Sequence, residues 1–385
     1  MSWSWRIGRL AGIDVFVHFT FVLLLAWIAF AHYSAHGDAG EALRGVLFIL
    51  ALFGIVVMHE LGHALAARRY GIKTRDITLL PIGGVARLER MPEKPSQELV
   101  VALAGPAVNV VLAAALYLGL YLNRDVLEVS AAARVGGGFL SQMFWINVGL
   151  AVFNLLPAFP MDGGRVVRAL LAMRMDYVRA TQTAAKLGQG MAVLFAVLGL
   201  FSNPMLIFVA LFVWIGAGQE ARMVQMRSAL GGIPVQEAMV TSFRALHPDE
   251  PISRAAEYGA TGFQQDFPVI DGEALVGVVT RKELSAAILG DDPSLRVGDV
   301  MQTEFVTTSP REMLYSALNR LQECNCRTLP VVDEGRLVGL LTSDIVAEVL
   351  MAQASSPHAA LRNSRSAGSM SPPPDLSSRR PAADV

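Results

Sequence analysis

The sequence predicts a polytopic α-helical membrane domain followed by a soluble α/β module. Three observations support this fold class. Of the 385 residues, 53% are hydrophobic and the mean hydropathy is +0.44, which is too apolar for a purely soluble protein. Apolar runs long enough to cross a bilayer recur up to residue 221. An internal repeat with soluble α/β character begins at Gly231.

Six apolar segments each have the roughly 17 to 25 residues that a membrane-spanning helix needs. They occupy residues 13–31, 43–67, 98–122, 138–157, 183–201 and 204–221. The first segment follows a basic start and ends in Ala29-Phe30-Ala31, a pattern that also occurs at cleaved secretory signals. Cleavage would leave an odd number of spans, which conflicts with the charge pattern, so we expect this segment to be retained.

Arginine and lysine sort the loops between these segments. Basic residues gather before the first segment and after the second, fourth and sixth, whereas the other three loops hold only Arg44, Arg124 and Arg134. The positive-inside rule therefore places both termini in the cytoplasm, as expected of a multi-pass protein of the cell (inner) membrane. A net charge of −1 and the lack of a basic-aromatic stripe exclude a nucleic-acid-binding footprint.

The second segment contains His59-Glu60-Leu61-Gly62-His63 within an almost unbroken apolar run. Two histidines four positions apart lie about one turn apart on one helix face, so both can bind a single Zn²⁺. Glu60 is then placed to take a proton from water. Ionisable side chains in a membrane-length helix cost roughly 2.5 to 3.5 kcal/mol each, which favours a functional site over a chance cluster.

A catalytic zinc site needs a third protein ligand, and the best candidate is Asp162. It lies where the fourth segment ends, in Asn154-Leu155-Leu156-Pro157-Ala158-Phe159-Pro160-Met161-Asp162-Gly163-Gly164. Together, the two motifs resemble those of the site-2 protease family of intramembrane zinc metalloproteases, peptidase family M50, over about residues 1 to 225. The resemblance implies one zinc per chain, bound by His59, His63 and Asp162. It also implies that Glu60 is the catalytic base and that Asn154 supports the site.

Two further features flank the catalytic segment. Residues 72–91 alternate polar and apolar side chains around a turn with Gly83 and Gly84, which predicts a β-hairpin at the membrane boundary. In the resembled family such a hairpin offers an edge strand to unwound substrate, so we expect both glycines to contact substrate; an inert loop is the alternative. Asn109, in Gly105-Pro106-Ala107-Val108-Asn109, is predicted to pack against the catalytic helix or to touch substrate.

A repeat at an offset of 62 residues organises the C-terminal part. Residues 235–239, 267–271 and 275–280 match 297–301, 329–333 and 337–342. Two copies of this strand-turn-strand-helix pattern resemble a CBS-domain pair, which often binds adenine nucleotides. The ribose-contacting carboxylate expected three residues after Thr280 is Glu283, but in the second copy Asp344 comes one residue early. Nucleotide binding and a docking module that binds a protein effector or forms a homodimer both stay open.

The remaining residues define the predicted domain limits. Cys324 and Cys326 suit a reducing cytosol and give no disulfide framework, and a Cys-x-Cys metal site lacks partner ligands. Residues from 353 onward are rich in Ser, Pro, Ala and Arg and are predicted to be disordered. The predicted domains are a six-span peptidase domain (1–230), two CBS domains (231–290 and 291–352) and the tail (353–385).

The sequence thus predicts a zinc-dependent intramembrane endopeptidase whose CBS pair modulates access or activity. The resemblance implies single-span membrane proteins as substrates, such as anti-sigma factors or other signalling precursors. The alternative is a CBS-regulated transporter or receptor in which the His, Glu and Asp residues form an ion path. Stoichiometric zinc together with peptide-bond cleavage distinguishes the two.

Overall fold

The computed structural model describes residues 3–81, 83–89, 92, 94–122, 138–261, 264–289 and 294–355. The chain divides into two compact units at Val224 and Gln225. Apart from residues 353–355, the predicted disordered tail lies outside the described residues, and so does the loop that contains Arg124 and Arg134.

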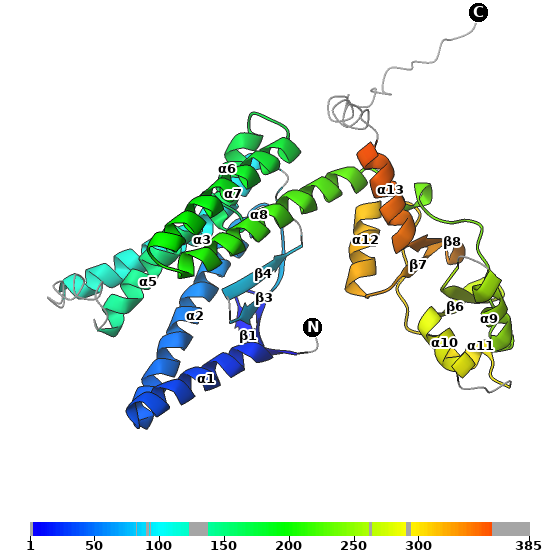
Figure 1. The fold of residues 1–385 in the computed structure, drawn as a ribbon, viewed down its shortest axis with the longest axis horizontal. Helices are drawn as coiled ribbons and strands as arrows, with labels where there is room; N and C mark the ends of the chain where they lie inside the picture. The colour runs from blue at the N-terminus through cyan, green and yellow to red at the C-terminus, as the bar shows by residue number, and fades with distance from the viewer. Residues whose placement is uncertain are drawn as a thin grey trace, which may run out of the picture. The chain divides into compact units, whose positions relative to one another are not determined.

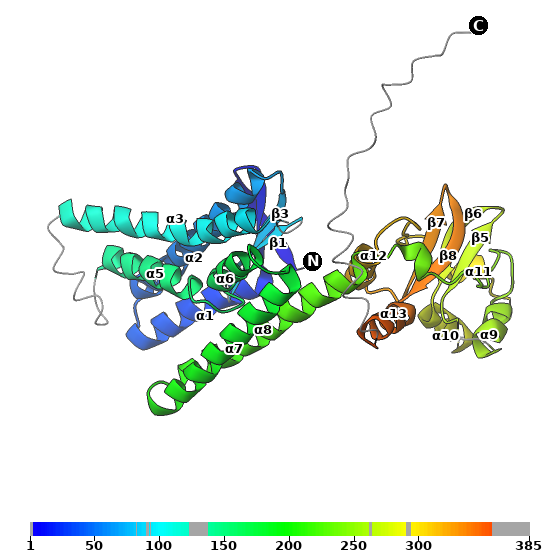
Figure 2. The same cartoon turned by 90° about the horizontal axis from the view of Figure 1, so that it is seen from above.

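The first unit is mainly helical because its apolar segments have to satisfy their backbone hydrogen bonds internally. Among the described residues, five helices are long and apolar enough to cross a membrane: α1 (Phe19–His36), α2 (Ala39–Arg68), α3 (Pro95–Leu122), α7 (Tyr177–Phe201) and α8 (Met205–Leu230). Two shorter helices, α5 (Phe139–Asn154) and α6 (Asp162–Ala172), lie between α3 and α7 in the sequence. Helices α7 and α8 follow one another in the chain (Figures 1 and 2), and the hydrophobic clusters that hold them also contain Ala158, Phe159 and Met161 of the connection between α5 and α6.

The fourth predicted span is shorter than expected. Helix α5 has 16 residues and ends at Asn154, whereas the prediction extended to residue 157. The chain leaves the helix there because Pro157 and Pro160 have no backbone N–H and cannot continue it. Within the part of the chain that the structure describes, five of the six predicted spans contain a helix long and apolar enough to cross a membrane, and the fourth contains a shorter apolar helix.

The first predicted span, residues 13–31, was wrong in its first six residues, which are not helical. Residues Ile13–His18 form a strand, β2, and the helix begins only at Phe19. The side chains of Ile13, Val15 and Val17 are buried, whereas those between them are half-buried. This alternation has the period of a strand, which a measure of total hydropathy cannot separate from a helix.

A four-stranded sheet accompanies the helices, in the order β1 (Ser4–Leu10), β2 (Ile13–His18), β3 (Thr74–Leu80) and β4 (Gly83–Leu88). Strands β3 and β4 pair antiparallel, with Leu80 opposite Gly83, in the region where the sequence predicts a hairpin. The hairpin is part of a larger sheet because β2 pairs with β3 in parallel. Strand β4 therefore lies at an edge of the sheet, and it packs against α2 (Figure 1).

The connection from α5 to α6 is a compact turn that depends on two glycines. A Cβ on Gly163 would lie 2.2 Å from the carbonyl oxygen of Leu156, and a Cβ on Gly164 would lie 2.6 Å from the backbone nitrogen of Phe159. Both distances are too short for any side chain. The glycines let the first turn of α6 pack directly on the preceding backbone, which sets the position of Asp162 at the start of that helix.

The second unit contains two copies of the repeat. One sheet has the order β5-β6-β8-β7, and α9 and α12 begin 62 residues apart, at Ile252 and Leu314. Its elements are η1 (Val235–Glu237), α9 (Ile252–Thr261), β5 (Phe267–Asp271), β6 (Ala274–Val279), α10 (Arg281–Leu289), α11 (Val297–Val300), α12 (Leu314–Glu323), β7 (Thr328–Asp333), β8 (Arg336–Thr342) and α13 (Ser343–Ser355).

The two copies are interlocked rather than independent. One core joins Leu230 and Val235, which precede the first copy's sheet strands, to Leu314 and Leu341 of the second copy. The other core joins Val297, which begins the second copy, to Phe267 and other residues of the first. A division at residue 290 therefore separates the sequence repeats but cuts through both hydrophobic cores.

We predict that Gly163→Ala destabilises the first unit, because the added methyl group overlaps the Leu155 and Leu156 carbonyl oxygens. Overpacking of this kind costs about 1 to 3 kcal/mol. Thermal unfolding of the purified protein in detergent measures the loss. Gly190→Ala on α7 is the control, since its Cβ meets nothing within 4 Å. A melting temperature of Gly163→Ala equal to that of the control would contradict the prediction.

Candidate metal centre

Two buried histidines on α2 face the interior of the first unit. His59 and His63 are each 6% exposed, and their Nε2 atoms lie 3.1 Å apart. They lie one turn apart on the same helix, as predicted from their spacing. Both Nε2 atoms can therefore reach a single bound atom.

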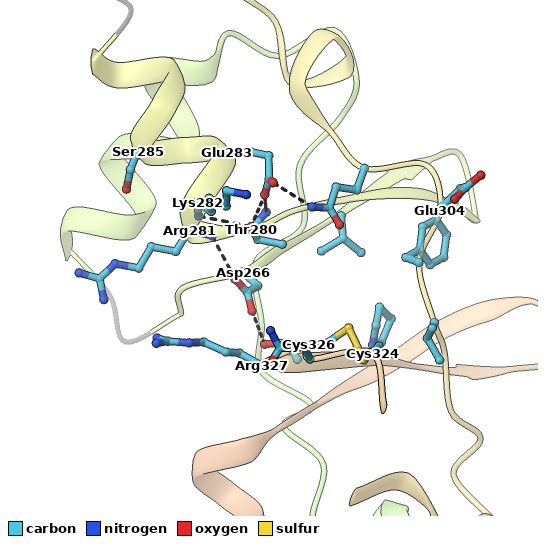
Figure 3. A pocket seen from close by; sticks show the side chains of 17 residues that line it. Asp266, Thr280, Arg281, Lys282, Glu283, Ser285, Glu304, Cys324, Cys326 and Arg327 are labelled. Atoms are coloured by element: carbon cyan, nitrogen blue, oxygen red, sulfur yellow. Dashed lines mark hydrogen bonds between the residues drawn. A yellow bond between two sulfur atoms is a disulfide. The ribbon is translucent and has the colours of Figure 1, made fainter. Parts of the chain in front are cut away.

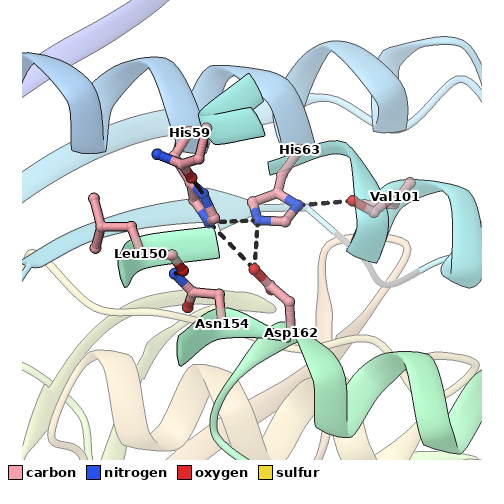
Figure 4. A network of polar contacts seen from close by, with 7 residues as sticks. His59, His63, Val101, Leu150, Asn154 and Asp162 are labelled. Carbon is pink, nitrogen blue, oxygen red and sulfur yellow. Dashed lines mark hydrogen bonds and ion pairs between the residues drawn. The ribbon is translucent and has the colours of Figure 1, made fainter. Parts of the chain in front are cut away.

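Asp162 completes the cluster from a distant part of the chain. Its Oδ2 atom lies 3.2 Å from Nε2 of His59 and 3.0 Å from Nε2 of His63 (Figure 4). The three ligand atoms all lie within 4.8 Å of one another, and all three residues are buried. Asp162 is the first residue of α6, so the turn after α5 brings it to the histidines.

The other nitrogen of each imidazole has its own partner. His63 Nδ1 lies 2.7 Å from the carbonyl oxygen of Val101, and His59 Nδ1 lies 2.5 Å from Oδ1 of Asn109. Asn109 in turn donates from Nδ2 to Oδ1 of Asn147, at 3.1 Å. Both partners of the histidines are oxygen acceptors, so each Nδ1 carries the proton and each Nε2 presents a lone pair.

The geometry of these acceptors fits a metal ion. With both Nδ1 atoms protonated, the two Nε2 atoms and Asp162 Oδ2 meet at 3.0 to 3.2 Å with no proton between them. The lone pairs of these three acceptor atoms repel one another unless a cation lies among them. Two imidazole nitrogens and one carboxylate oxygen are a ligand set of catalytic zinc sites, which keep a fourth position for water. The residues present therefore suit Zn²⁺.

A glycine makes room for the two imidazoles. A Cβ on Gly105 of α3 would lie 2.2 Å from Nε2 of His63 and 2.7 Å from Nε2 of His59. No side chain can occupy that position while the rings keep these orientations. Gly62 similarly lets α2 approach α3, because its Cβ would lie 2.7 Å from the carbonyl oxygen of Ala104.

The other predicted site residues have different neighbours. Glu60 lies against β4, since a Cβ on Gly84 would be 3.0 Å from the Glu60 Cγ atom. Gly83, at φ 139°, has no neighbour within 4 Å of its Cβ position. Asn154 lies near Asp162 in Figure 4 and donates from Nδ2 to the Leu150 carbonyl oxygen of its own helix, at 2.9 Å.

Asn109 packs against the catalytic helix, which is one of the two roles predicted for it, and its contact with substrate stays a prediction. Its side chain is fully buried and holds His59, so it is a positioning residue for a ligand. The sequence analysis also missed Asn147, which is buried and holds Asn109. A polar amide within the apolar segment 138–157 was the available signal, because such a group needs a partner inside the protein.

The second unit has a pocket of about 710 Å³ whose lining includes Thr280, Lys282, Glu283 and Arg327 (Figure 3). Glu283 accepts hydrogen bonds from the backbone nitrogen and the hydroxyl of Thr280 and from Gln302. Burial opposes its ionisation, but the hydrogen bonds outweigh burial and lower the pKa of the Glu283 carboxyl below its usual value. Glu283 is therefore a carboxylate at neutral pH.

Cys324 and Cys326 line the same pocket, and the structure joins them in a disulfide (Figure 3). The expectation of two reduced cysteines without a disulfide was therefore wrong for this structure. The chain turns between them at Asn325, which has φ 53°. This turn brings the two Cα atoms to 5.1 Å, so both sulfur atoms lie within bonding reach.

Known proteins resemble the chain in both units. Residues 47–135 and 125–198 match the profile described as Peptidase family M50, and residues 235–290 and 297–352 match that of the CBS domain. A zinc metalloprotease of Methanocaldococcus jannaschii is 35% identical over 280 residues, which cover 72% of this chain and 78% of that one. Rip3 of Mycobacterium tuberculosis is 30% identical over 373 residues, covering 89% and 92%.

A solved structure, the site-2 protease from Methanocaldococcus jannaschii, is 36% identical to this chain. The match covers 57% of this chain and 95% of that chain, with a TM-score of 0.42. The M50 match includes His59, His63 and Asp162, the three residues of the metal cluster.

We predict that Gly105→Ala displaces the imidazoles and weakens zinc binding by about 10- to 100-fold, the range that is usual when the surroundings of metal ligands are disturbed. Zinc affinity is measured by competition with a chromogenic chelator. Gly119→Ala, on the same helix, is the matched control because its Cβ meets nothing within 4 Å. Equal zinc affinities of the two variants would show that the contact with the histidines is unimportant.

Proposed function

This chain belongs to the site-2 protease family of zinc metalloproteases, peptidase family M50, and we propose that it cleaves membrane-spanning segments of single-span proteins. One observation carries the proposal. The three ligand atoms are buried among apolar helices, and His59 and His63 lie on α2, a helix long and apolar enough to cross a bilayer. A peptide bond reaches such a centre most directly from within the membrane.

The membership also decides between the two functions that the sequence left open. The family is a family of peptidases, and its relatives are named as zinc metalloproteases. The protein is therefore a multi-pass membrane enzyme that uses zinc, and the transporter or receptor alternative is not retained.

In the proposed mechanism His59, His63 and Asp162 hold the zinc ion. Zinc in such a site polarises a carbonyl group and lowers the pKa of water. The Glu60 carboxylate accepts a proton from the attacking water and returns it to the leaving amine. Asn109, Asn147 and the Val101 carbonyl keep the imidazoles in the tautomer that binds metal. We assign Asn154, at the end of α5, a supporting role beside Asp162.

The β4 edge is the proposed docking strand for substrate. It has β3 as its only strand neighbour among the described residues, and Gly84 places it directly against Glu60. A substrate helix shields its own amides, so it has to unwind before attack, and an extended segment can then add to a sheet edge. We therefore keep Gly83 and Gly84 as substrate-contacting residues, through their backbone.

We further propose the membrane topology that follows from the charge pattern. Helix α5 packs along α3 and completes a six-span domain despite its 16 residues. Both termini and the second unit then face the cytoplasm, in keeping with the basic residues after the second, fourth and sixth spans. Natural substrates would be anti-sigma factors or other signalling precursors that retain one membrane span.

The second unit is proposed to regulate proteolysis by binding an adenine nucleotide in the Glu283 pocket. That pocket has three basic residues (Arg281, Lys282 and Arg327) and three acidic ones (Asp266, Glu283 and Glu304). A second pocket, of about 640 Å³, has two basic residues (Arg244 and Arg327) and three acidic ones (Asp266, Asp344 and Glu348). The balance of charge favours the Glu283 pocket for a phosphate-bearing ligand. A protein effector or a homodimer at the CBS pair is the alternative.

We predict that Glu60→Gln keeps zinc but lowers hydrolysis by about 100- to 10,000-fold, because an amide cannot accept the proton. Zinc content and cleavage of a model single-span substrate are measured on the same purified sample. Glu41→Gln, on the same helix but 18 positions away from His59, is the control. Hydrolysis by Glu60→Gln at the control's rate would exclude Glu60 as the base.

We also predict that Glu283→Ala weakens nucleotide binding by at least about tenfold, because a ribose hydroxyl loses its charged acceptor. ATP, ADP and AMP are titrated separately onto the full chain in detergent. Asp344→Ala, in the other pocket, should leave the affinity unchanged. Loss of binding only in Asp344→Ala would place the nucleotide in the second pocket, and no binding to the parent would favour the protein effector or homodimer.

A further inference from the structure

A buried charged cluster lies close to the metal centre and has no part in the mechanism described above. At its centre is Arg168 of α6, which is 1% exposed. Its Nε and Nη2 atoms lie 2.7 and 2.5 Å from Oε1 of Glu98 on α3, and its Nη1 atom pairs with Glu220 on α8. The rings of Phe159 and Tyr177 face the guanidinium, with centroids at 5.0 and 5.2 Å. Four helices therefore meet at one side chain.

Burying this many charges is unfavourable unless the geometry is well defined. A buried ion pair recovers its desolvation cost only through close, directional contacts, and here Glu98 Oε2 and Arg168 Nη2 have no hydrogen-bond partner in the described part of the chain. Apolar residues could fill the same space at less cost. The cluster is therefore better explained by what it orients than by the stability that it adds.

The cluster connects α6, which carries one metal ligand, to α3, which carries the groups that orient the other two. Helix α3 carries Val101 and Asn109, which orient His63 and His59, and Glu98 lies three residues before Val101. Helix α6 carries Asp162, and Arg168 lies six residues after it. The pair between Glu98 and Arg168 thus sets the position of the third ligand relative to the groups that hold the first two.

A short helix needs such an attachment. Helix α6 has 11 residues and follows a compact turn, and a rotation or a slide of it would move Asp162 away from the histidines. Because the ligand atoms are 3.0 to 3.2 Å apart, a displacement of about 1 Å is enough to spoil a metal site, which tolerates only small errors in geometry.

We propose that Arg168 is a positioning residue for the metal centre, which holds α6 against Glu98 and Glu220 so that Asp162 meets His59 and His63. The proposal rests on the assignment of Asp162 as a zinc ligand. It assigns Arg168 no contact with the metal or the substrate. It predicts that the effect of Arg168 on zinc passes through Asp162 alone.

A double-mutant cycle tests this prediction. Zinc affinity is measured by chelator competition on the purified full chain in detergent, for the parent, Arg168→Met, Asp162→Ala and the double variant. We expect Arg168→Met to lower zinc affinity by about 10- to 100-fold in the parent, as is usual for residues that orient ligands. We expect no further loss in the Asp162→Ala background, where there is no third ligand to position.

Two outcomes would overturn the proposal, and a third would refute the ligand assignment on which the proposal rests. An equal loss from Arg168→Met in both backgrounds, or no loss in the parent, would show that Arg168 has only a structural role. Unchanged zinc affinity in Asp162→Ala alone would instead refute the ligand assignment. Thr181→Val is the control for general destabilisation, since it removes the hydrogen bond of a buried side chain on α7 and should leave zinc affinity unchanged.

The conservative variant Arg168→Lys keeps the test decisive if Arg168→Met does not fold. Lysine retains the charge but lacks the fork that reaches both Glu98 and Glu220. We expect its zinc affinity to lie between those of the parent and of Asp162→Ala. A zinc affinity equal to the parent's would contradict a positioning role for the guanidinium.

Discussion

The fold of the first unit depends on bringing three acceptor atoms together: Nε2 of His59, Nε2 of His63 and Oδ2 of Asp162. Asp162 lies 103 positions after His59, yet its Oδ2 atom is 3.2 Å from the Nε2 atom of that residue. The three acceptors have no proton to share, because the Nδ1 atoms of both imidazoles already donate to oxygen. Only a cation makes this arrangement favourable. The binding free energy of zinc therefore contributes directly to holding α2 and α6 together.

The buried polar residues of the apolar helices keep the three metal ligands in position. Asn109, Asn147, Glu98 and Arg168 are all buried, and each would be costly in such surroundings without a partner. Their partners link α5 to α3, α3 to the histidines, and α6 to α3 and α8. Gly105 contributes in a different way, because its lack of a side chain leaves space for the two imidazole rings.

Much of the site could be predicted because its motifs are local in the sequence. The spacing of His59 and His63 indicates one helix face, and a repeat with a constant offset shows a duplication. The partners of Asn109 and Arg168 could not be predicted in this way, because they depend on how distant helices pack. Strand β2 was missed for a different reason: its partner β1 adjoins it in the sequence, but total hydropathy does not distinguish strand from helix.

The central claim is that His59, His63 and Asp162 bind one zinc ion per chain. X-ray absorption at the zinc edge, recorded on the purified full-length protein together with its metal content, tests this claim directly. We predict one zinc per chain with only nitrogen and oxygen neighbours at about 2.0 to 2.2 Å, including two imidazoles. A sulfur neighbour at about 2.3 Å, or a single imidazole, would contradict a site made of the two histidines and Asp162.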